Sequence, residues 1–319
     1  MAGSRNNPST DVVSQAVAAC RVRHAQPGES VVIAFSGGLD STVLLHVASC
    51  LATTAPLDLS ALHVHHSLSP NADTWADSCR KVCAELAIPL TVRRVAVPSD
   101  TGKGIEGAAR DVRHQVLKEH PADWILLAHH EDDQAETVLH NLLRGTGVRG
   151  VAGIPESRGR FLRPFLGIAR DTLREYATLH GLTWVEDESN CDCRYTRNFL
   201  RHEIMPVITS RFPRAAKQIS AASRRFRETD ALLDDLARMD LGVRLPEFPM
   251  PLKLFRELPE RRARNLLRAL IIWHHQQPPD ERRLNEFVRQ LHSAGSDRHP
   301  RIDLANYALW CERGELHFK

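Results

Sequence analysis

The segment of the sequence with the clearest chemical potential is the loop of residues 36–41, which reads Ser-Gly-Gly-Leu-Asp-Ser. Five apolar residues, 31–35, precede it, as is typical of a buried strand in a parallel sheet, and apolar residues recur at helical spacing after it. A strand, a glycine turn and a helix start direct free backbone N–H groups and the helix dipole at one point. The segment therefore predicts an anion-binding site, although a turn that binds nothing is the simpler alternative.

The acid at position 40 separates this loop from the common P-loop, in which a lysine and then a serine or threonine follow the second glycine. A carboxylate beside a phosphate site makes chemical sense when a divalent cation lies between them. In such sites Mg²⁺ typically takes one or two carboxylates together with phosphate oxygens. Asp40 is thus a candidate magnesium ligand at a nucleotide-binding loop.

A second acidic segment follows another apolar run, residues 123–128, and opens a predicted helix. Its acids include Asp132, Asp133 and Glu136, and His129 comes just before them. An acid at a helix start is often only a cap that complements the helix dipole. However, acids crowded at the carboxyl end of a strand lie where open α/β sheets bind their ligands, so a functional role is the favoured interpretation.

Three histidines, His63, His65 and His66, stand at the end of a predicted strand over residues 57–65. A zinc site is one interpretation of this cluster. The sequence offers no cysteine or carboxylate partner at ligand spacing, so contact with a nucleotide is the favoured one.

Arginine is concentrated in the middle of the chain. Between residues 144 and 227 there are 16 arginines and lysines against 8 acids, and all but one of the basic residues are arginine. The guanidinium group of arginine binds phosphates through paired hydrogen bonds and stacks on bases, so this excess predicts nucleic-acid contact. A solvated basic surface is the alternative. Arg110 and Arg113 share one face of a predicted helix, 107–119, and either reach over the phosphate site or are simply surface cations.

The remaining pattern predicts an α/β fold with a doubly wound, mostly parallel sheet over residues 1–212. A smaller, mainly helical domain is expected over residues 213–319, because helical periodicity runs through 214–240 and alternation through 301–318 predicts a terminal hairpin. A chain of 319 residues is long enough for two such domains.

Composition favours a cytoplasmic protein with no membrane segment. The sequence contains no run of apolar residues as long as a membrane span, and its first ten residues lack the apolar core of a secretory signal. Its seven cysteines are scattered, which is typical of thiols that stay reduced.

Taken in order, these and several further motifs resemble the tRNA(Ile)-lysidine synthase family. The motifs are the 36–41 loop, His63-Val64-His65-His66, Gly104-Ile105-Glu106 with Arg110 and Arg113, Ala128-His129-His130 with Asp133 and Glu136-Thr137, Arg144-Gly145-Thr146-Gly147, Glu186-Asp187-Glu188-Ser189-Asn190, and Arg197-Asn198-Phe199-Leu200-Arg201. The resemblance covers residues 28–212 closely and the helical domain less so. The first loop alone is shared with other N-type, or PP-loop, ATP pyrophosphatases, so a fold of that type is implied.

The resemblance implies a two-step reaction that uses ATP, with Mg²⁺, and free L-lysine. ATP adenylylates the carbonyl oxygen at carbon 2 of the wobble cytidine, position 34, in a tRNA(Ile) with the CAU anticodon. The ε-amine of lysine then displaces AMP, which yields lysidine and pyrophosphate and changes AUG decoding to AUA. The lysine amine has a reference pKa near 10.4, so a group such as Asp133, Glu136 or His129 must accept its proton.

The resemblance also implies roles for individual residues, in four groups. The ATP and pyrophosphate site would contain Ala34, Ser36, Gly37, Gly38, Asp40, Ser41 and His63. Asp40 and Asp133 would bind Mg²⁺, and Arg113 would steady the α-phosphate, which makes these three the expected catalytic residues. Lysine would be bound by Asp132, Asp133 and Glu136, with His129 beside them. The tRNA would contact Arg110, Arg144, Asn198, Arg201, Arg224 and Arg225.

Two other functions share parts of this pattern. A tRNA thiolase of the PP-loop type would need reactive cysteines, for which Cys191 and Cys193 form the one tight pair in the sequence. An RNA-binding protein with an inactive nucleotide fold would have no evident use for Asp40, Asp133 and Arg113 together. The family also suggests a homodimer, and some of its members carry a further C-terminal domain that this chain is expected to lack.

Overall fold

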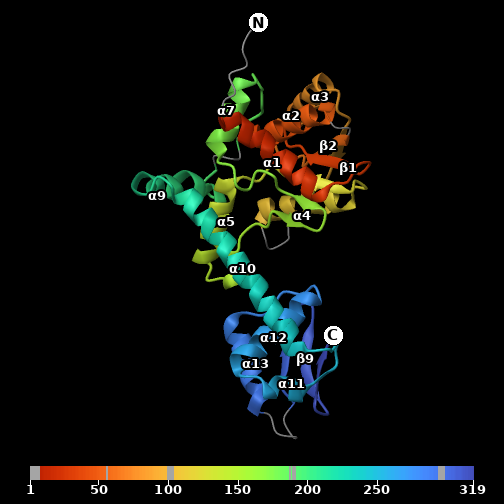
Figure 1. Cartoon of the computed structure of the whole chain (residues 1–319), viewed down its shortest axis with the longest axis vertical. Helices are drawn as coiled ribbons and strands as arrows, with labels where there is room; N and C mark the ends of the chain where they lie inside the picture. Colours follow the sequence, from red (N-terminus) through yellow and green to blue (C-terminus); the bar gives the residue numbers. More distant parts are fainter. Residues whose placement is uncertain (1–7, 55–56, 99–103, 187, 189–191, 294–298) are drawn as a thin grey trace. The chain divides into compact units, whose positions relative to one another are not determined.

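The first part of the chain folds around one sheet, of which β1 (Ser30–Ala34) and β2 (Asp58–His65) are labelled in Figure 1. Its strand order is β3 (Leu90–Arg94), β2, β1, β4 (Trp124–Leu126), β6 (Phe161–Leu162) and β5 (Ser157–Arg158). The structure is a computed structural model that describes residues 8–54, 57–98, 104–186, 188, 192–293 and 299–319. It divides into two units, residues 1–226 and 227–319. The predicted boundary after residue 212 falls earlier, between two helices, and the assignment of domains to 1–212 and 213–319 stays a prediction.

The strands of this sheet are short and mostly parallel. Their bounds are β1 Ser30–Ala34, β2 Asp58–His65, β3 Leu90–Arg94, β4 Trp124–Leu126, β5 Ser157–Arg158 and β6 Phe161–Leu162. Strand β1 pairs in parallel with β2 on one side and with β4 on the other, and among the described strands of this sheet only β5 runs antiparallel. The predicted doubly wound, mostly parallel α/β fold is confirmed.

Both faces of the sheet are covered by helices, as the apolar run in β1 predicts. Ile33 belongs to one buried cluster and its neighbour Val32 to another, so successive side chains of β1 point into cores on opposite faces. Helices α1, α2 and α7 pack against one another over the first of these clusters. The helices of this unit are α1 Pro8–His24, α2 Leu39–Thr54, α3 Ala72–Glu85, α4 Gly104–Glu119, α5 Glu131–Leu143, α6 Val148–Val151, α7 Arg170–Leu179, α8 Thr196–Phe199 and α9 Met205–Arg211.

The strand order places the loop after β1 beside the segment after β4. The chain runs outward from β1 through β2 to β3 and then returns to the other side of β1 to form β4. This reversal is the topological switch point, where open α/β sheets bind ligands at the carboxyl ends of their strands. The two segments that the sequence singles out, residues 36–41 and 129–137, therefore open from neighbouring strands at this point.

The second unit combines helices with an antiparallel sheet of order β7–β10–β9–β8 (Figure 1). Its elements are β7 Met250–Pro251, α11 Leu252–Glu257, α12 Glu260–Trp273, α13 Glu281–Ser293, β8 Arg301–Asp303, β9 Ala308–Glu312 and β10 Glu315–Phe318. Helix α10, Ala215–Leu241, leads into it along the chain. The predicted terminal hairpin is confirmed as β9–β10, and Arg313 and Gly314 at its turn have φ of 51° and 80°.

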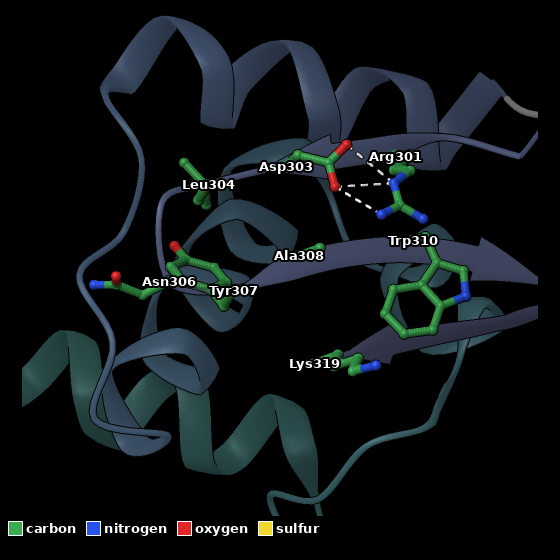
Figure 2. A pocket seen from close by; sticks show the side chains of 8 residues that line it. All are labelled: Arg301, Asp303, Leu304, Asn306, Tyr307, Ala308, Trp310 and Lys319. Atoms are coloured by element: carbon green, nitrogen blue, oxygen red, sulfur yellow. Dashed lines mark hydrogen bonds and ion pairs between the residues drawn. The ribbon is translucent and has the colours of Figure 1, made fainter.

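The sheet of the second unit carries an open pocket of about 500 Å³ (Figure 2). Arg301 of β8 and Trp310 of β9 stand side by side there, with the guanidinium carbon 5.8 Å from the ring centroid. Arg301 also donates hydrogen bonds to Asp303. The Trp310 ring stacks on that of His317, with 5.3 Å between the ring centroids. The remaining lining residues are Leu304, Asn306, Tyr307, Ala308 and Lys319.

Among the described residues, the structure contains no helix that is both long enough and apolar enough to cross a membrane.

Candidate active site

The loop after β1 is held open by its own hydrogen bonds. The Ser41 hydroxyl donates to the Gly38 carbonyl at 3.0 Å, and the Ser36 and Ser41 hydroxyl oxygens are 3.0 Å apart. Gly37 has φ of +84°, and a Cβ on it would lie 2.9 Å from the Sγ of Cys79. The Gly37 carbonyl accepts a hydrogen bond from the Val185 N–H at 2.9 Å, which fastens the loop from outside. Glycine is therefore required at position 37 by both conformation and space.

Ala34 and His63 lie at the base of this loop. Ala34 is the last residue of β1 and pairs with Leu62 in β2. The Nδ1 of His63 lies 2.9 Å from the Phe35 carbonyl and so donates a hydrogen bond to it. Burial lowers the pKa of His63, which keeps the ring neutral and its Nδ1 protonated. His63 thus braces the backbone where the strand passes into the loop.

The acidic segment after β4 begins α5 with a reciprocal cap. His130 is the N-cap residue: its Nδ1 accepts from the Asp133 N–H at 3.4 Å, and its own N–H donates to the Asp133 Oδ2 at 3.1 Å. The helix starts at Glu131, rather than at Asp132 or Asp133 as the sequence predicts. Asp133 is therefore a capping residue, and capping uses only one of its carboxylate oxygens.

His130 also joins the two acids that the sequence predicts as a pair. Its Nε2 lies 3.6 Å from the Oδ2 of Asp40 and 3.4 Å from the Oδ2 of Asp133. The structure thus brings Asp40 from the start of α2 and Asp133 from the start of α5 to one buried histidine. Burial raises the pKa of Asp40, with His130 and Arg170 acting against it. Burial acts in the same direction on Asp133, but His130 and Arg197 outweigh it and hold its pKa well below the usual range.

Glu136 is buried under two arginines. Its side chain is only 3% exposed. The Nε of Arg201 donates to its Oε1 at 2.7 Å, and the Nε of Arg197 donates to its Oε2 at 3.0 Å. Both arginines also reach the Oδ1 of Asp133 at 3.0 Å. Asp133 and Glu136 therefore form one acid pair that Arg197 and Arg201 neutralise.

Asp132 and His129 both precede this acid pair in sequence. The Oδ2 of Asp132 accepts the Arg170 N–H at 2.9 Å, which ties the start of α7 to α5. The Nε of Arg170 lies 3.9 Å from the Oδ1 of Asp40. Burial lowers the pKa of His129 to about 3, so its ring is neutral near pH 7.

The predicted arginines of α4 lie on an exposed part of that helix. Arg113 is close enough to His66 and His129 to lower the pKa of both through its charge, although burial is the larger cause for each. It therefore stands near the carboxyl ends of β2 and β4. Burial lowers the pKa of Arg163, and the charge of Arg110 lowers it further.

The candidate tRNA contacts are spread over several elements. Arg144 caps the end of α5 and lies 3.4 Å from the Nε2 of His140. Asn198 donates to the Asp192 carbonyl at 3.1 Å. Arg224 and Arg225 are exposed on α10, and the charge of Arg224 acts on Glu131. Arg201 differs from these, because it lies against the acid pair.

Sequence reasoning places Arg197 only in the 197–201 motif and misses its two hydrogen bonds to the acid pair. The one available signal was its spacing of four residues from Arg201, which places both side chains on one face of a helix. Asp187, Ser189 and Asn190 of the 186–190 motif lie outside the described residues, as do Cys191 and the side chain of Glu106.

Asp40 and Asp133 fit a magnesium site in their chemistry. The Oδ1 of Asp40 is buried and has no hydrogen-bond partner among the described residues, which leaves a carboxylate oxygen for a cation. Two carboxylates with phosphate oxygens form a typical Mg²⁺ ligand set. For zinc, no group of three or more His, Cys, Asp or Glu side chains in the described part of the chain is arranged to hold an ion by itself.

Comparison with known proteins agrees with the motifs. A family model described as a PP-loop domain matches residues 10–208, and one described as a TilS substrate binding domain matches residues 250–317. The tRNA(Ile)-lysidine synthase of Nitrosomonas europaea is 38% identical over 100% of this chain and 71% of its own length. The chain belongs to the tRNA(Ile)-lysidine synthase family. The enzyme of that name from Alkalilimnicola ehrlichii is 42% identical over 91% of this chain and 67% of its own length.

Among solved structures, the U34-tRNA thiolase NcsA from Methanococcus maripaludis with its [4Fe-4S] cluster has a similar fold. The TM-score is 0.55, with 18% identity over 68% of this chain and 80% of that one. At this identity the likeness concerns the fold alone. It gives no support to a thiolase reaction.

Proposed function

We propose that this member of the lysidine synthase family ligates L-lysine to carbon 2 of cytidine 34 in tRNA(Ile) with the CAU anticodon, through an adenylylated tRNA. The observation that carries the proposal is the meeting of Asp40 and Asp133 on His130 beside the open glycine loop. A binding module has no evident need for two buried acids at an anion-binding turn. The products are lysidine-bearing tRNA, AMP and pyrophosphate.

In the first step the loop residues bind the departing pyrophosphate. The hydroxyls of Ser36 and Ser41 lie 3.0 Å apart beside the Gly37–Gly38 turn, and oxyanions would accept hydrogen bonds from this loop at the start of α2. Asp40 and Asp133 would hold Mg²⁺, which when bound neutralises phosphate charge. Arg113, near the ends of β2 and β4, would stabilise the α-phosphate as the cytidine oxygen attacks it.

In the second step the acid pair binds the ammonium group of lysine and removes a proton from it, which leaves a neutral amine. Asp133, with its low pKa, suits binding of a cation rather than acceptance of a proton. His129 is also a weak base, because burial lowers its pKa to about 3. Of the three proton acceptors that the sequence offers, this leaves Glu136. The neutral amine then attacks carbon 2, and AMP leaves with the former carbonyl oxygen.

The tRNA is proposed to contact both units. The candidates for tRNA contact in and near the catalytic unit are Arg110, Arg144, Asn198, Arg224 and Arg225. Ala34 and His63 are assigned to the nucleotide site instead, and Asp132 to the edge of the lysine site. In the second unit, Trp310 and Arg301 offer an aromatic face and a cation at one pocket (Figure 2). A homodimer and a cytoplasmic location stay predictions.

The proposal is tested with labelled lysine, ATP and two purified tRNAs. We expect label to enter tRNA(Ile) with the CAU anticodon and not tRNA(Met), which has the same anticodon. Pyrophosphate release should also require tRNA(Ile). Absence of label from tRNA(Ile) would end the proposal. Transfer of labelled sulfur from a sulfur donor to the tRNA, lost in the Cys193→Ser variant, would favour the thiolase reaction instead.

A further inference from the structure

The acid pair proposed to bind lysine is already occupied in this structure. The two oxygens of Glu136 accept three hydrogen bonds from arginine: 2.7 Å and 2.9 Å from Arg201, and 3.0 Å from Arg197. The Oδ1 of Asp133 accepts one from each arginine, and its Oδ2 accepts the His130 N–H. Each oxygen of the pair therefore has a donor in the protein itself.

Charge balance makes this arrangement incompatible with a bound lysine. Two carboxylates face two guanidinium groups, so the pair and its partners sum to zero. An ammonium ion brings three donors and one further positive charge into a site where Glu136 is 3% exposed. An unmatched buried charge is strongly unfavourable, so lysine can enter only if at least one guanidinium leaves.

The arginines are placed so that they can leave. Their side chains are 26% and 22% exposed, whereas the acids beneath them are almost fully covered. Arg197 lies on α8, and Arg201 on the π-helical segment Leu200–Ile204 that follows it. Single π-helical turns are locally weak and are frequent at functional sites. Rotation of these side chains toward solvent would expose the acids without disturbing α5.

We propose that Arg197 and Arg201 block the lysine site until phosphate groups draw their guanidinium groups away. This inference rests on the proposed role of Asp133 and Glu136 as lysine ligands. Phosphate competes well for arginine because its oxygens accept paired, charge-assisted hydrogen bonds. The phosphate comes from the RNA backbone or from ATP. Either source makes lysine binding follow substrate loading, which keeps the amine away from ATP before the RNA base is activated.

The test is a measurement of L-lysine affinity by titration calorimetry under four conditions. The wild-type protein is titrated alone, with a non-hydrolysable ATP analogue and Mg²⁺, with tRNA(Ile), and with both. We expect phosphate-bearing ligands to tighten lysine binding by roughly 5- to 150-fold, the usual range for coupled sites. The arm that produces the gain identifies the source of the phosphate. Equal lysine affinity in all four arms would overturn the proposal.

Variants separate blocking from support of the site. Arg197→Gln and Arg201→Gln should each bind lysine more tightly than the wild type when no phosphate is present, and should lose most of the gain on adding tRNA. Weaker lysine binding, or an unchanged gain, would show that the arginines build the site rather than block it. If the glutamine variants do not fold, Arg201→Lys replaces them, because it keeps the positive charge but not the paired N–H donors of the guanidinium. Its lysine affinity should then increase on adding tRNA by an amount between the increase of the wild type and no increase.

The matched control is Arg23→Gln, which removes one arginine from the same unit. Arg23 is 60% exposed and lies 3.6 Å from Glu156, away from the acid pair. Its lysine affinity and its coupling to tRNA should equal those of the wild type. If labelled lysine enters tRNA(Ile) but no coupling is found, only this inference fails. If no lysine enters the tRNA, the proposed function itself fails.

Discussion

His130 is the residue that relates the two functional segments to each other. Its backbone and Nδ1 cap α5, while its Nε2 faces both Asp40 and Asp133. The imidazole lies between the two buried carboxylates, whose charges still act on each other: burial raises the pKa of Asp40, and the charge of Asp133 raises it further. The pKa values of these acids are displaced in opposite directions, which is typical of functional sites.

At the residue scale, Arg113 is expected to act on the first step. In Arg113→Ala, adenylylation of tRNA(Ile) should fall by about 10²–10³-fold, the usual effect of losing one charge-stabilising donor. Single-turnover formation of AMP-tRNA measures this rate. Arg80→Ala, a change on the exposed face of α3, should leave the rate unaltered. A fall of less than a few-fold in Arg113→Ala would remove Arg113 from the mechanism.

His129 predicts how stability depends on pH. Its pKa is about 3 in the folded chain and 6.5 in its ordinary state, because burial disfavours the charged ring. Folding therefore favours the neutral form of His129. Its contribution to the free energy of unfolding is fully present above pH 6.5 and is lost as the pH falls toward 3. One such group contributes a slope of about 1.4 kcal/mol per pH unit in that window.

Urea unfolding at several pH values between 7 and 4 tests this dependence. His129→Gln should reduce the slope of unfolding free energy against pH by the contribution of this one residue. His202→Gln, on an exposed part of the chain, should leave the slope unchanged. An unchanged slope in His129→Gln would mean that the ring is not buried in its neutral form.

At the scale of elements, the turn between β1 and α2 is set by Gly37. An alanine there meets two obstacles, a φ of +84° and the Cys79 Sγ at 2.9 Å. Gly37→Ala should lower the free energy of unfolding by more than about 1 kcal/mol and weaken binding of an ATP analogue by about tenfold or more. The double variant Gly37→Ala/Cys79→Ala relieves the contact but not the dihedral angle, so it should recover only part of both losses.

The control for this prediction is Gly167→Ala, because an added Cβ at that position would meet no atom within 4 Å. Chemical unfolding and calorimetry are the measurements. If Gly37→Ala binds the ATP analogue as the wild type does, the glycine turn is not the phosphate site.

Sequence patterns were sufficient for the elements whose residues repeat a clear period. The buried run at 31–35 and the helical period of 214–240 appear in the structure as β1 and α10. Sequence reasoning could not foresee which side chains would meet across the switch point, because those meetings depend on tertiary packing. Arg201 was expected on the tRNA surface for this reason, and Arg197 was not expected in the site at all.

At the scale of the whole molecule, each unit has its own buried core, and the second unit is proposed to contact RNA. Its pocket places the Trp310 ring beside the Arg301 guanidinium (Figure 2). Stacking of a base on an aromatic ring contributes about 1–3 kcal/mol by alanine substitution. Trp310→Ala should therefore weaken tRNA binding by roughly 5- to 150-fold at fixed salt, as measured by filter binding.

Leu245→Ala, which changes another exposed apolar residue of the second unit, is the control for this measurement. Its tRNA affinity should match that of the wild type. Equal affinity of Trp310→Ala and the wild type would place the RNA contact elsewhere on this unit.

The measurement that tests the central claim most directly separates the two chemical steps. Wild type, Asp40→Asn and Glu136→Gln, each checked for a normal unfolding midpoint, are incubated with labelled ATP and tRNA(Ile) without lysine. We predict labelled AMP on the tRNA with wild type and Glu136→Gln, and none with Asp40→Asn, while Glu136→Gln then needs far more lysine to complete the reaction. Equal loss of AMP-tRNA in both variants, or its formation by Asp40→Asn, would contradict the account.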